Sequence, residues 1–501
     1  MDEAKKPLTP EAKVPPAAPP EPVVFSIRDW LILPAALALA LLWRHVFGFG
    51  ALLEHGLPAL GAALFILAIW ACVLLGLGRG VQWNRWNAGL AVGVGLLTAA
   101  SVMYGDYAVR MINYLLILCG SALAFFSLSG CAEHSLDNAR CILETVGLTF
   151  RALFLNWTKP FSAAASEKRR GKTWTKGVLI GLVCAVPPLI LIISLLSQAD
   201  AVFGNLFMGL SDRLEAFFSA SSFWKLLWTL LWMMLFFSAL YFLRHPPQRK
   251  KTELPSPSGA REMATVPLIT VLVLLCAVYG IFVAIQFAYL FGGAETAAMT
   301  GGYAQYARSG FFQLVLVAVI NLAAILATTV FAEHRPVFRV LCSILIGMTA
   351  VILFSAFWRM RLYTAAYGLS LLRAMTLWAM AFISVCLVLA ALRVWWDRFR
   401  FWPFFAAVGL AGWIVFNFIN IDARIAAHNV DAYLSGQLES IDVGYLTRLS
   451  ADTWPALERL AAAPQNGLSP EALEEIEAFR QDLAAADPSW QAWCVSSIRY
   501  R

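Results

Sequence analysis

Long apolar runs alternate with short polar connections along most of the chain. The runs are about 18 to 28 residues long, which fits the ~20 residues that an α-helix needs to cross ~30 Å of hydrocarbon, whereas barrel strands would alternate over about 10 residues. The pattern therefore predicts an all-α polytopic membrane bundle of about eleven transmembrane helices, at residues 28–49, 56–78, 88–104, 111–129, 177–197, 223–243, 264–292, 310–332, 340–358, 376–394 and 402–420. Composition agrees, because 60% of the residues are hydrophobic, 14% are charged and the mean hydropathy is +0.69.

Changes in composition divide the chain into five predicted parts. The first is proline-rich and without periodicity, as disordered tails are, and the last is polar and acidic with helix-capping residues before short amphipathic segments. In order, the parts are a disordered cytoplasmic tail (1–26), four transmembrane helices (27–130), an amphipathic and basic loop (131–176), seven transmembrane helices (177–420) and a small C-terminal extramembrane helical domain (421–501).

Basic residues are concentrated in alternate connections. Lys and Arg favour the cytoplasmic side of a membrane, so this distribution predicts a cytoplasmic N-terminus and, with an odd number of spans, a C-terminus outside the cytoplasm. The formal net charge is +7. The basic residues lie beside apolar runs, which indicates contact with lipid headgroups and argues against a nucleic-acid partner. No signal-peptide pattern begins the sequence, and the first span is expected to direct insertion.

The loop at 131–176 contains "ARCILETVGLTFRALFLNW", in which apolar residues recur at helical spacing, followed by "SEKRRGKTWTK". These segments predict an amphipathic helix on the inner leaflet with a polybasic extension, serving either as a topological anchor or as a docking site. Cys131, His134 and Cys141 lie in this region, but their spacing fits no metal motif. The nine cysteines lie mostly in apolar runs, and we expect no disulfide.

Signatures of catalysis are missing from the sequence. It has no phosphate-binding glycine loop, paired-histidine zinc helix or nucleophile elbow, so no catalytic, metal-ligating or cofactor-binding residue is predicted. The spans have almost no Asp, Glu or Lys at mid-depth, which disfavours an ion-coupled transporter. Gln286, Asn321 and Asn417 are the main polar residues within spans, and hydrogen bonds between helices explain them.

Three polar stretches are predicted to lie at the outer face. They are "GGYAQYARSGFFQL" (301–314), "RMRLYTAAYGLSLLRAM" (359–375) and "NFINIDARIAAHNVDAYL" (417–434). Helical spacing aligns Arg359, Tyr363 and Tyr367 in the second stretch. In the third it aligns Asn420, Arg424 and His428, while Asp422 and Asn429 project elsewhere. Charges near an interface tend to pair, so Asp422 and Asp431 are expected partners for Arg308, Arg361 or Arg373.

These stretches allow three interpretations. Salt bridges could clamp the outer loops to the terminal domain, with the tyrosines as interfacial aromatic residues. Alternatively, the arginines could bind a lipid phosphate or another anionic group in an outer-leaflet cleft lined by tyrosine. A third possibility is a general-base pair of His428 and Asp422, although six residues along a helix place them on different faces.

At the same stretches the chain resembles an uncharacterised family of bacterial polytopic membrane proteins, domain of unknown function 4173, with its relative 4153. The resemblance covers roughly residues 175–500. The matching residues are Tyr303, Tyr306, Arg308, Gly310 and Phe311; Leu362, Tyr363, Tyr367, Gly368 and Leu369; and Asn420, Asp422, Ile425, Ala426 and Asn429, followed by Asp431 or Asp442 and by Tyr433 or Tyr445. It implies a bacterial inner-membrane protein without an assigned activity, and "WQAWCVSSIRYR" resembles the family's C-terminal end.

The leading functional hypothesis is binding, sensing or moving an anionic or lipid-like envelope component at an outward-facing cluster. The predicted ligand-binding residues are Tyr303, Tyr306, Arg308, Arg361, Tyr363, Tyr367, Arg373, Asp422, His428 and Asn429. Expected partners are membrane lipid and an anionic small molecule or envelope protein. The alternatives are a membrane sensor or scaffold whose external helical domain binds a protein, and an envelope transferase or hydrolase. We expect binding rather than catalysis.

Overall fold

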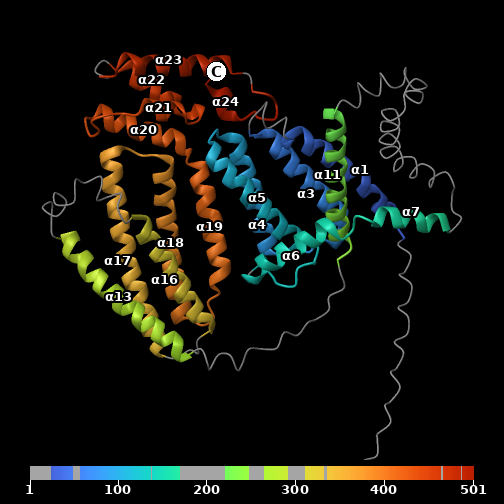
Figure 1. Cartoon of the computed structure of the whole chain (residues 1–501), viewed down its shortest axis with the longest axis horizontal. Coiled ribbons are helices and arrows are strands. Elements are labelled where there is room, and N and C mark those ends of the chain that lie inside the picture. The colour runs from blue at the N-terminus through green and yellow to red at the C-terminus, as the bar shows by residue number, and fades with distance from the viewer. Residues whose placement is uncertain are drawn as a thin grey trace, which may run out of the picture. The chain divides into compact units, whose positions relative to one another are not determined.

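The protein is described here by a computed structural model, which covers residues 24–48, 57–136, 138–169, 220–246, 265–291, 311–331, 336–463, 467–486 and 488–500. All regular elements in these ranges are helices, which confirms the all-α fold (Figure 1). The long apolar helices are α1 (Ile27–Phe47), α3 (Leu60–Leu77), α4 (Arg85–Met103), α5 (Tyr107–Leu128), α11 (Ala220–Arg244), α13 (Thr265–Phe291), α16 (Phe311–Phe331), α17 (Pro336–Tyr367), α18 (Leu371–Trp395) and α19 (Phe401–Phe418).

Every predicted span except 177–197 coincides with one of these helices, and 177–197 lies outside the described residues. Within the described ranges, nine helices are long and apolar enough to cross a membrane, and α16 contributes a shorter apolar segment, Gln313–Thr329. Their outward surfaces expose large apolar side chains, such as Leu75 at 80% and Leu118 at 68%. Such exposure fits a lipid environment and does not fit water.

The remaining helices are shorter and more polar. Two follow α5, namely α6 (Arg140–Phe154) and α7 (Lys159–Arg169). The others form the C-terminal module, defined here as residues 421–500: α20 (Ile421–Leu434), α21 (Val443–Thr447), α22 (Trp454–Ala462), α23 (Pro470–Ala485) and α24 (Val495–Arg499). No helix of this module is among the candidate membrane spans of the described chain.

The chain divides into two compact units, Met1–Leu37 with Leu153–Tyr241, and Ala38–Ala152 with Phe242–Arg501. In the first unit, the ring of Phe25 lies 6.2 Å from that of Phe237 and 5.4 Å from that of Tyr241. The backbone N–H of Asn156 donates to the Ser238 hydroxyl at 3.1 Å. The predicted domain boundaries stay predictions.

The second unit contains most of the bundle and the whole C-terminal module. One apolar core joins α13, α16, α17 and α18 around the fully buried Ile325, Leu345, Ile352 and Cys386. A second core joins α4, α5, α18 and α19 around Trp413 and Phe416. The C-terminal module has its own core, which includes Ile425, Val430, Leu446, Leu457 and Leu460. The module lies across the ends of α17, α18, α19 and α5 (Figure 1).

Helix α17 is longer than a bilayer requires. Its 32 residues span about 48 Å at 1.5 Å per residue, against ~30 Å of hydrocarbon. The excess carries Arg359, Arg361, Tyr363 and Tyr367 toward the C-terminal module. The first part of the second predicted polar stretch, residues 359–367, is therefore an extension of a transmembrane helix.

Candidate functional site

The first predicted stretch cannot be placed, because Tyr303, Tyr306 and Arg308 lie outside the described residues. The second stretch forms the connection between α17 and α18. Helix α17 ends at Tyr367, and Gly368 follows with a φ of +71°, a conformation that favours glycine. Arg361 is exposed on α17.

Arg373, in the first turn of α18, binds the connection between α17 and α18. Its guanidinium donates to the carbonyls of Tyr367, at 2.9 Å, and Gly368, at 2.5 Å. It also lies 4.2 Å from the ring centroid of Tyr363, at cation–π distance. Tyr363 in turn lies 5.3 Å from Tyr367. Arg373 therefore holds the connection in shape.

Helix α20 carries the third stretch and presents two different faces, as its spacing predicts. Arg424, His428 and Asp431 are exposed, whereas Asp422 and Asn429 are buried. The Asn429 side chain accepts a hydrogen bond from the Leu369 N–H at 2.6 Å and donates to the Leu369 carbonyl at 2.8 Å. This bidentate contact fixes the α17–α18 connection to the C-terminal module.

Two further features tighten the same junction. The Tyr445 hydroxyl accepts a hydrogen bond from the Leu371 N–H at 2.8 Å. A Cβ on Gly368 would lie 2.7 Å from Asn429 Oδ1, which is closer than real Cβ atoms approach. Glycine at this position therefore serves both the positive φ and the close approach of Asn429.

Asp422 faces a second carboxyl group, that of Asp106, across the boundary between the module and the bundle. Asp106 caps α5, with Oδ1 accepting from the Val109 N–H at 3.0 Å, and Asp422 Oδ2 accepts from the Ser450 N–H at 3.1 Å. Asp106 Oδ2 and Asp422 Oδ1 are buried and have no hydrogen-bond partner within the described chain. The two carboxyl groups lie close enough to shift each other's pKa, and a hydrogen bond between them requires a proton on one of the two groups.

Burial makes this carboxyl pair hard to ionise fully. Loss of hydration and the nearby Asp106 carboxylate raise the pKa of Asp422 to about 7. Loss of hydration also raises the pKa of Asp106, although its cap to α5 and the Arg110 charge oppose the rise. The pair is therefore most stable with one shared proton near neutral pH.

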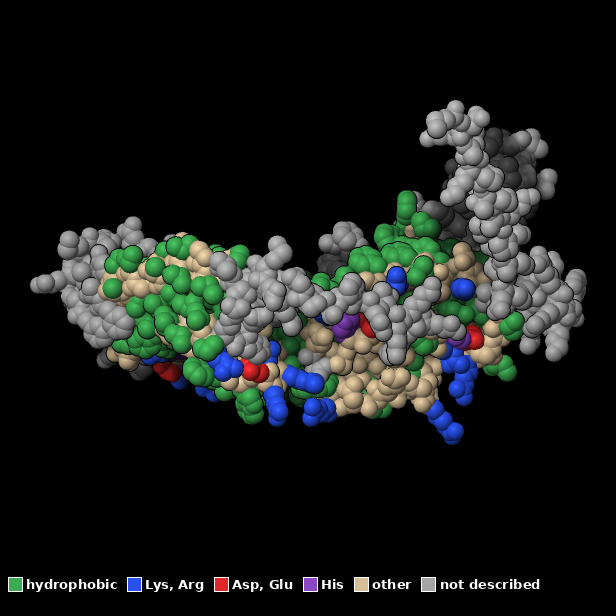
Figure 2. Space-filling view, turned by 90° about the horizontal axis from the view of Figure 1, so that it is seen from below, with side chains coloured by type: hydrophobic (Ala, Val, Ile, Leu, Met, Phe, Trp, Pro, Cys, Tyr) green, Lys and Arg blue, Asp and Glu red, His purple; other side chains and the backbone are tan. Residues whose placement is uncertain are grey.

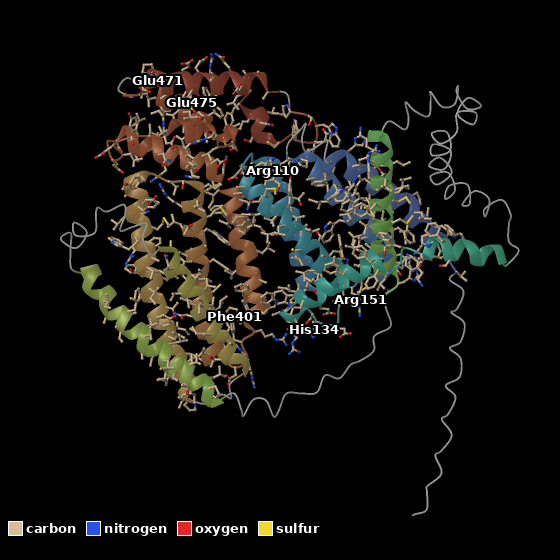
Figure 3. All side chains as sticks on the ribbon, in the orientation of Figure 1. Arg110, His134, Arg151, Phe401, Glu471 and Glu475 are labelled. Atoms are coloured by element: carbon tan, nitrogen blue, oxygen red, sulfur yellow. The ribbon has the colours of Figure 1, made fainter. Side chains whose placement is uncertain are left out.

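Arg110 sets the charge balance around the carboxyl pair. It lies at the end of α5 that the C-terminal module covers (Figure 3), and it is 7% exposed. Its guanidinium donates to the carbonyls of Tyr104 at 2.7 Å and Leu57 at 3.4 Å. With one proton on the pair, the two carboxyls and this arginine sum to zero charge. Full ionisation leaves one negative charge in a buried site.

A buried polar network continues from the carboxyl pair into the bundle. The Asn113 amide donates to Asn417 Oδ1 at 2.6 Å, and the Trp413 indole donates to Asn113 Oδ1 at 2.8 Å. Asn417 therefore bonds across helices, as expected, and Asn321 does so with Thr349 at 3.0 Å. The cavity beside Asp422 is about 20 Å³, which has room for about one water.

The C-terminal module also contacts the bundle at Ser450 and through its last residues. A Cβ on Gly105 would lie 2.8 Å from the Ser450 Cβ, so the α4–α5 connection and the module are in tight contact. The backbone N–H groups of Ala59 and Gly61 donate to the Gln491 carbonyl at 2.8 and 3.0 Å, and that of Leu60 donates to the Trp493 carbonyl at 3.2 Å. These bonds tie the C-terminal tail to the beginning of α3.

The predicted arginine partners of the two aspartates were wrong where the structure describes them. Asp431 pairs with Arg459 at 2.6 Å, because both lie on the outer surface of the module. Asp422 is buried against Asp106 and Ser450, where neither Arg361 nor Arg373 reaches it. His428 and Asp422 lie on different faces of α20, so they form no general-base pair.

Sequence reasoning missed Asp106 and Arg110, and it named Tyr445 only as one of two alternative matches to the family pattern. Asp106 had one local signal, since Gly-Asp directly before an apolar run is typical of a turn followed by a helix cap. Its pairing with Asp422 had none. Within the described chain, no group of three His, Cys, Asp or Glu residues is arranged to hold a metal ion.

The fold and site define a multi-pass helical membrane protein whose C-terminal module is bonded onto one end of the transmembrane bundle. The chain matches the model of a family described as a domain of unknown function (DUF4153) over residues 63–460, and it belongs to this family. The match includes both Asp106 and Asp422, and it confirms the resemblance inferred from the polar stretches. No curated protein and no solved structure matches the chain at a significant level.

Proposed function

We propose that the protein is a membrane sensor whose C-terminal module presents a surface to an envelope protein partner, and whose hold on the bundle changes with protonation of Asp106 and Asp422. The observation that carries the proposal is the buried contact between these two carboxyls, one on the bundle and one on the module. The neighbouring residues Asn429, Arg373 and Tyr445 bind within the protein, which favours a clamp over a ligand site.

Charge explains how the clamp would respond. Arg110 on α5 and Tyr445 on α21 act electrostatically on the carboxyl pair. Arg373 on α18 acts in turn on Tyr445. Among them only Arg110 offers a nearby positive charge, and it balances one carboxylate. Loss of the shared proton therefore adds an unbalanced negative charge, and burying such a charge costs several kcal/mol. Separation of the module from the bundle would rehydrate it.

We place the protein in a bacterial inner membrane, with the module outside the cytoplasm. The support is that Arg339, Arg393, Arg398 and Arg400 all lie where α17 begins, α18 ends or α19 begins, opposite the module, and that basic residues favour the cytoplasmic side. A reporter that is active only outside the cytoplasm, fused after residue 501, should be active. If this fusion is inactive and a reporter that works only in the cytoplasm is active at the same position, the module faces the cytoplasm and the proposed orientation is wrong.

The sensing proposal is tested by hydrogen exchange on the protein in lipid nanodiscs at pH 5.5 and pH 8.5. In the wild type, amides of α20 and of residues 445–452 should exchange faster at the higher pH after correction for intrinsic rates. Asp422→Asn keeps the shape and can donate to Asp106 without ionising, so its exchange should no longer change between the two pH values. A wild type with no pH response would exclude the mechanism.

The biological consequence is tested in the source bacterium with the chromosomal copy deleted. Wild type, Asp422→Asn and, as an exposed control, Asp431→Asn are expressed, and growth under envelope stress is followed across external pH. We expect only Asp422→Asn to lose the pH dependence. If all three behave alike while exchange confirms an altered clamp, the clamp has no sensing role.

A second candidate function is supported by the exposure of Arg361 and Tyr367 beside Tyr363. Together with Tyr303, Tyr306 and Arg308, these residues would bind an anionic or lipid-like envelope component. Arg361→Ala should then abolish function while the melting temperature and hydrogen exchange stay unchanged. A functional Arg361→Ala protein would remove this candidate.

A further inference from the structure

A large cavity lies at the end of the bundle opposite the C-terminal module. Its volume is about 910 Å³, and it lies between the α5–α6 connection, α16 and the α18–α19 connection. We call it the basic cavity because Arg393, Arg398 and Arg400 line it. Phe401 on one wall and His134 near the other lie at this end of the second unit (Figure 3).

The basic cavity has a surplus of positive charge. Asp397 is the single acidic residue among those that line it, and its carboxylate is bound to Arg339 at 3.0 Å. Arg393 is held by hydrogen bonds to the carbonyls of Asp397, at 2.5 Å, and Phe399, at 3.2 Å. Those carbonyls fix its position without neutralising its charge. The exposed Arg398 makes no hydrogen bond or ion pair within the described chain.

The wall of the cavity that contains Phe401 is aromatic. Trp402 and Phe401 stack on Phe405, with ring centroids 5.5 and 5.6 Å apart. Leu326 of α16 adds an aliphatic surface. Guanidinium groups beside aromatic and aliphatic walls match a ligand with an anionic head and an apolar body. A free anion would leave the apolar wall unused.

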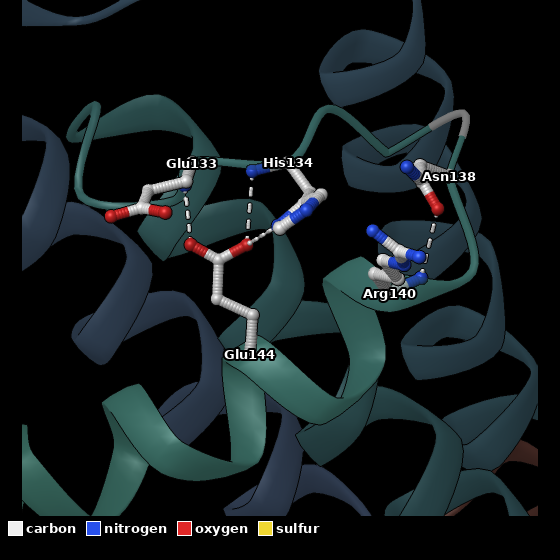
Figure 4. A network of polar contacts seen from close by, with 5 residues as sticks. All are labelled: Glu133, His134, Asn138, Arg140 and Glu144. Carbon is white, nitrogen blue, oxygen red and sulfur yellow. Dashed lines mark hydrogen bonds and ion pairs between the residues drawn. The ribbon is translucent and has the colours of Figure 1, made fainter. Parts of the chain in front are cut away.

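The α5–α6 connection forms a fixed rim (Figure 4). Glu144 accepts hydrogen bonds from the backbone N–H of Glu133 and, at 2.9 Å each, from the backbone N–H and Nδ1 of His134. Burial raises the pKa of Glu144, but these bonds outweigh it and the net pKa is lowered. Asn138, which lines the cavity, caps α6 by accepting from the Arg140 N–H at 3.1 Å.

Helix α6 indicates the membrane depth of this rim. Its apolar residues Leu143, Val146 and Phe150 lie on one face and are exposed at 79%, 52% and 64%. An amphipathic helix with such a face lies in the interface between headgroups and acyl chains. Figure 2, viewed from the end opposite the module, shows Lys and Arg more prominently than Asp and Glu among hydrophobic side chains. The basic cavity is therefore at headgroup level.

We propose that the basic cavity binds an anionic phospholipid, with its phosphate at Arg393, Arg398 and Arg400 and its acyl chains along Phe401, Trp402 and Phe405. This site lies at the other end of the bundle from the carboxyl pair and does not depend on the sensing proposal. Basic pockets between transmembrane helices are a known arrangement for anionic headgroups.

The test uses the full chain in mild detergent, titrated with phosphatidylglycerol or phosphatidylcholine, with retained lipids counted by native mass spectrometry. Wild type should hold phosphatidylglycerol more tightly than phosphatidylcholine. Arg398→Gln should weaken the tightest phosphatidylglycerol site about 5-fold, and Arg398→Gln with Arg400→Gln should weaken it further. Arg151→Gln is the matched control, because Arg151 is an exposed arginine on α6 that does not line the cavity (Figure 3).

The proposal holds if Arg151→Gln retains wild-type affinity and the melting temperature of Arg398→Gln is unchanged. If the double variant fails to fold, Arg398→Gln alone tests the proposal. The Arg398 side chain makes no hydrogen bond or ion pair within the described chain, so its replacement should not affect folding. Equal affinity for the two lipids, equal loss in Arg151→Gln, or displacement of lipid by excess inorganic phosphate would overturn it. The last outcome would identify a site for free phosphate.

Discussion

The two ends of the second unit use charge in opposite ways. Beneath the C-terminal module, Arg110 and Asp422 are buried and Asp106 is half-buried, and each of the three forms a hydrogen bond with a backbone group. At the other end, Arg398 is exposed beside a cavity of about 910 Å³. Buried polar groups fix one arrangement, because an unpaired one is costly, whereas exposed charges stay available for a ligand. The first end is therefore a fixed contact between the C-terminal module and the bundle, called the joint below. The second end is suited to binding a ligand.

The largest effect is expected from Asn429→Ala, which breaks the joint. It removes both hydrogen bonds to Leu369 and leaves the partly buried N–H and carbonyl of that residue without partners, at about 1–3 kcal/mol for each group. Local hydrogen exchange of α20 and of residues 368–372 should report a loss of about 3 kcal/mol. His428→Ala, on the exposed face of α20, is the control and should change little. Equal effects in both variants would contradict a bidentate clamp.

A pH effect of about 2 kcal/mol should follow from Asp422. Its folded pKa is raised from 3.8 to about 7, so the folded state holds the proton more tightly than the unfolded state does. The resulting stability is complete below the unfolded pKa and is lost as pH rises through the folded one. The loss is about 1.4 kcal/mol per pH unit near pH 5.5 and falls to about half of that at pH 7, where the folded carboxyl is half ionised.

The measurement is the opening free energy of α20 as a function of pH. Asp422→Asn should flatten this profile and make the module more stable than the wild type at pH 8.5. A profile that rises with pH would mean that the pair is stabilised in its ionised form, contrary to the shared-proton arrangement.

A smaller loss, about 1–2 kcal/mol, is expected for Arg373→Gln. The variant loses charge-assisted bonds to the carbonyls of Tyr367 and Gly368 and the contact with Tyr363, but its side chain is only half-buried. Exchange should rise at residues 367–373 and less in α22. Arg373→Lys keeps the charge and should recover part of the stability. No recovery would assign the effect to guanidinium geometry alone.

The smallest effect, under about 0.5 kcal/mol, is expected for Arg459→Gln. Arg459 and Asp431 form an ion pair with side chains 51% and 65% exposed, and such surface pairs contribute little. Thermal unfolding in detergent should be unchanged within error. A loss as large as that of Asn429→Ala would show that exposed charges also hold the joint, and the contrast between the two ends would fail.

The sequence predicted the fold where local pattern decides it. Run length and apolar composition located every described transmembrane helix, and helical spacing separated the buried Asp422 and Asn429 from the exposed Arg424 and His428. It did not predict what the buried residues meet. Asp106 and Asp422 come from distant segments, and only tertiary packing brings two carboxyls together where complementary charge was expected.

The opposite end was missed for another physical reason. Arg393, Arg398 and Arg400 belong to the basic connections that were interpreted as determinants of topology and as contacts for lipid headgroups, because they lie beside apolar runs. Their role as a cavity wall depends on how far the α5–α6 connection stands from α18 and α19. No local pattern encodes that separation.

The bonds between residues 59–61 and residues 491–493 bear on how the chain is made. The first turn of α3 is synthesised long before the carbonyls of Gln491 and Trp493, which accept hydrogen bonds from its N–H groups. The amino-terminal helices therefore enter the membrane before these hydrogen bonds exist. The bonds form only after translation has passed Trp493. Formation of this contact is thus a late step in the assembly of the bundle, and a folded tag joined directly after residue 501 would lie beside the contact while it forms.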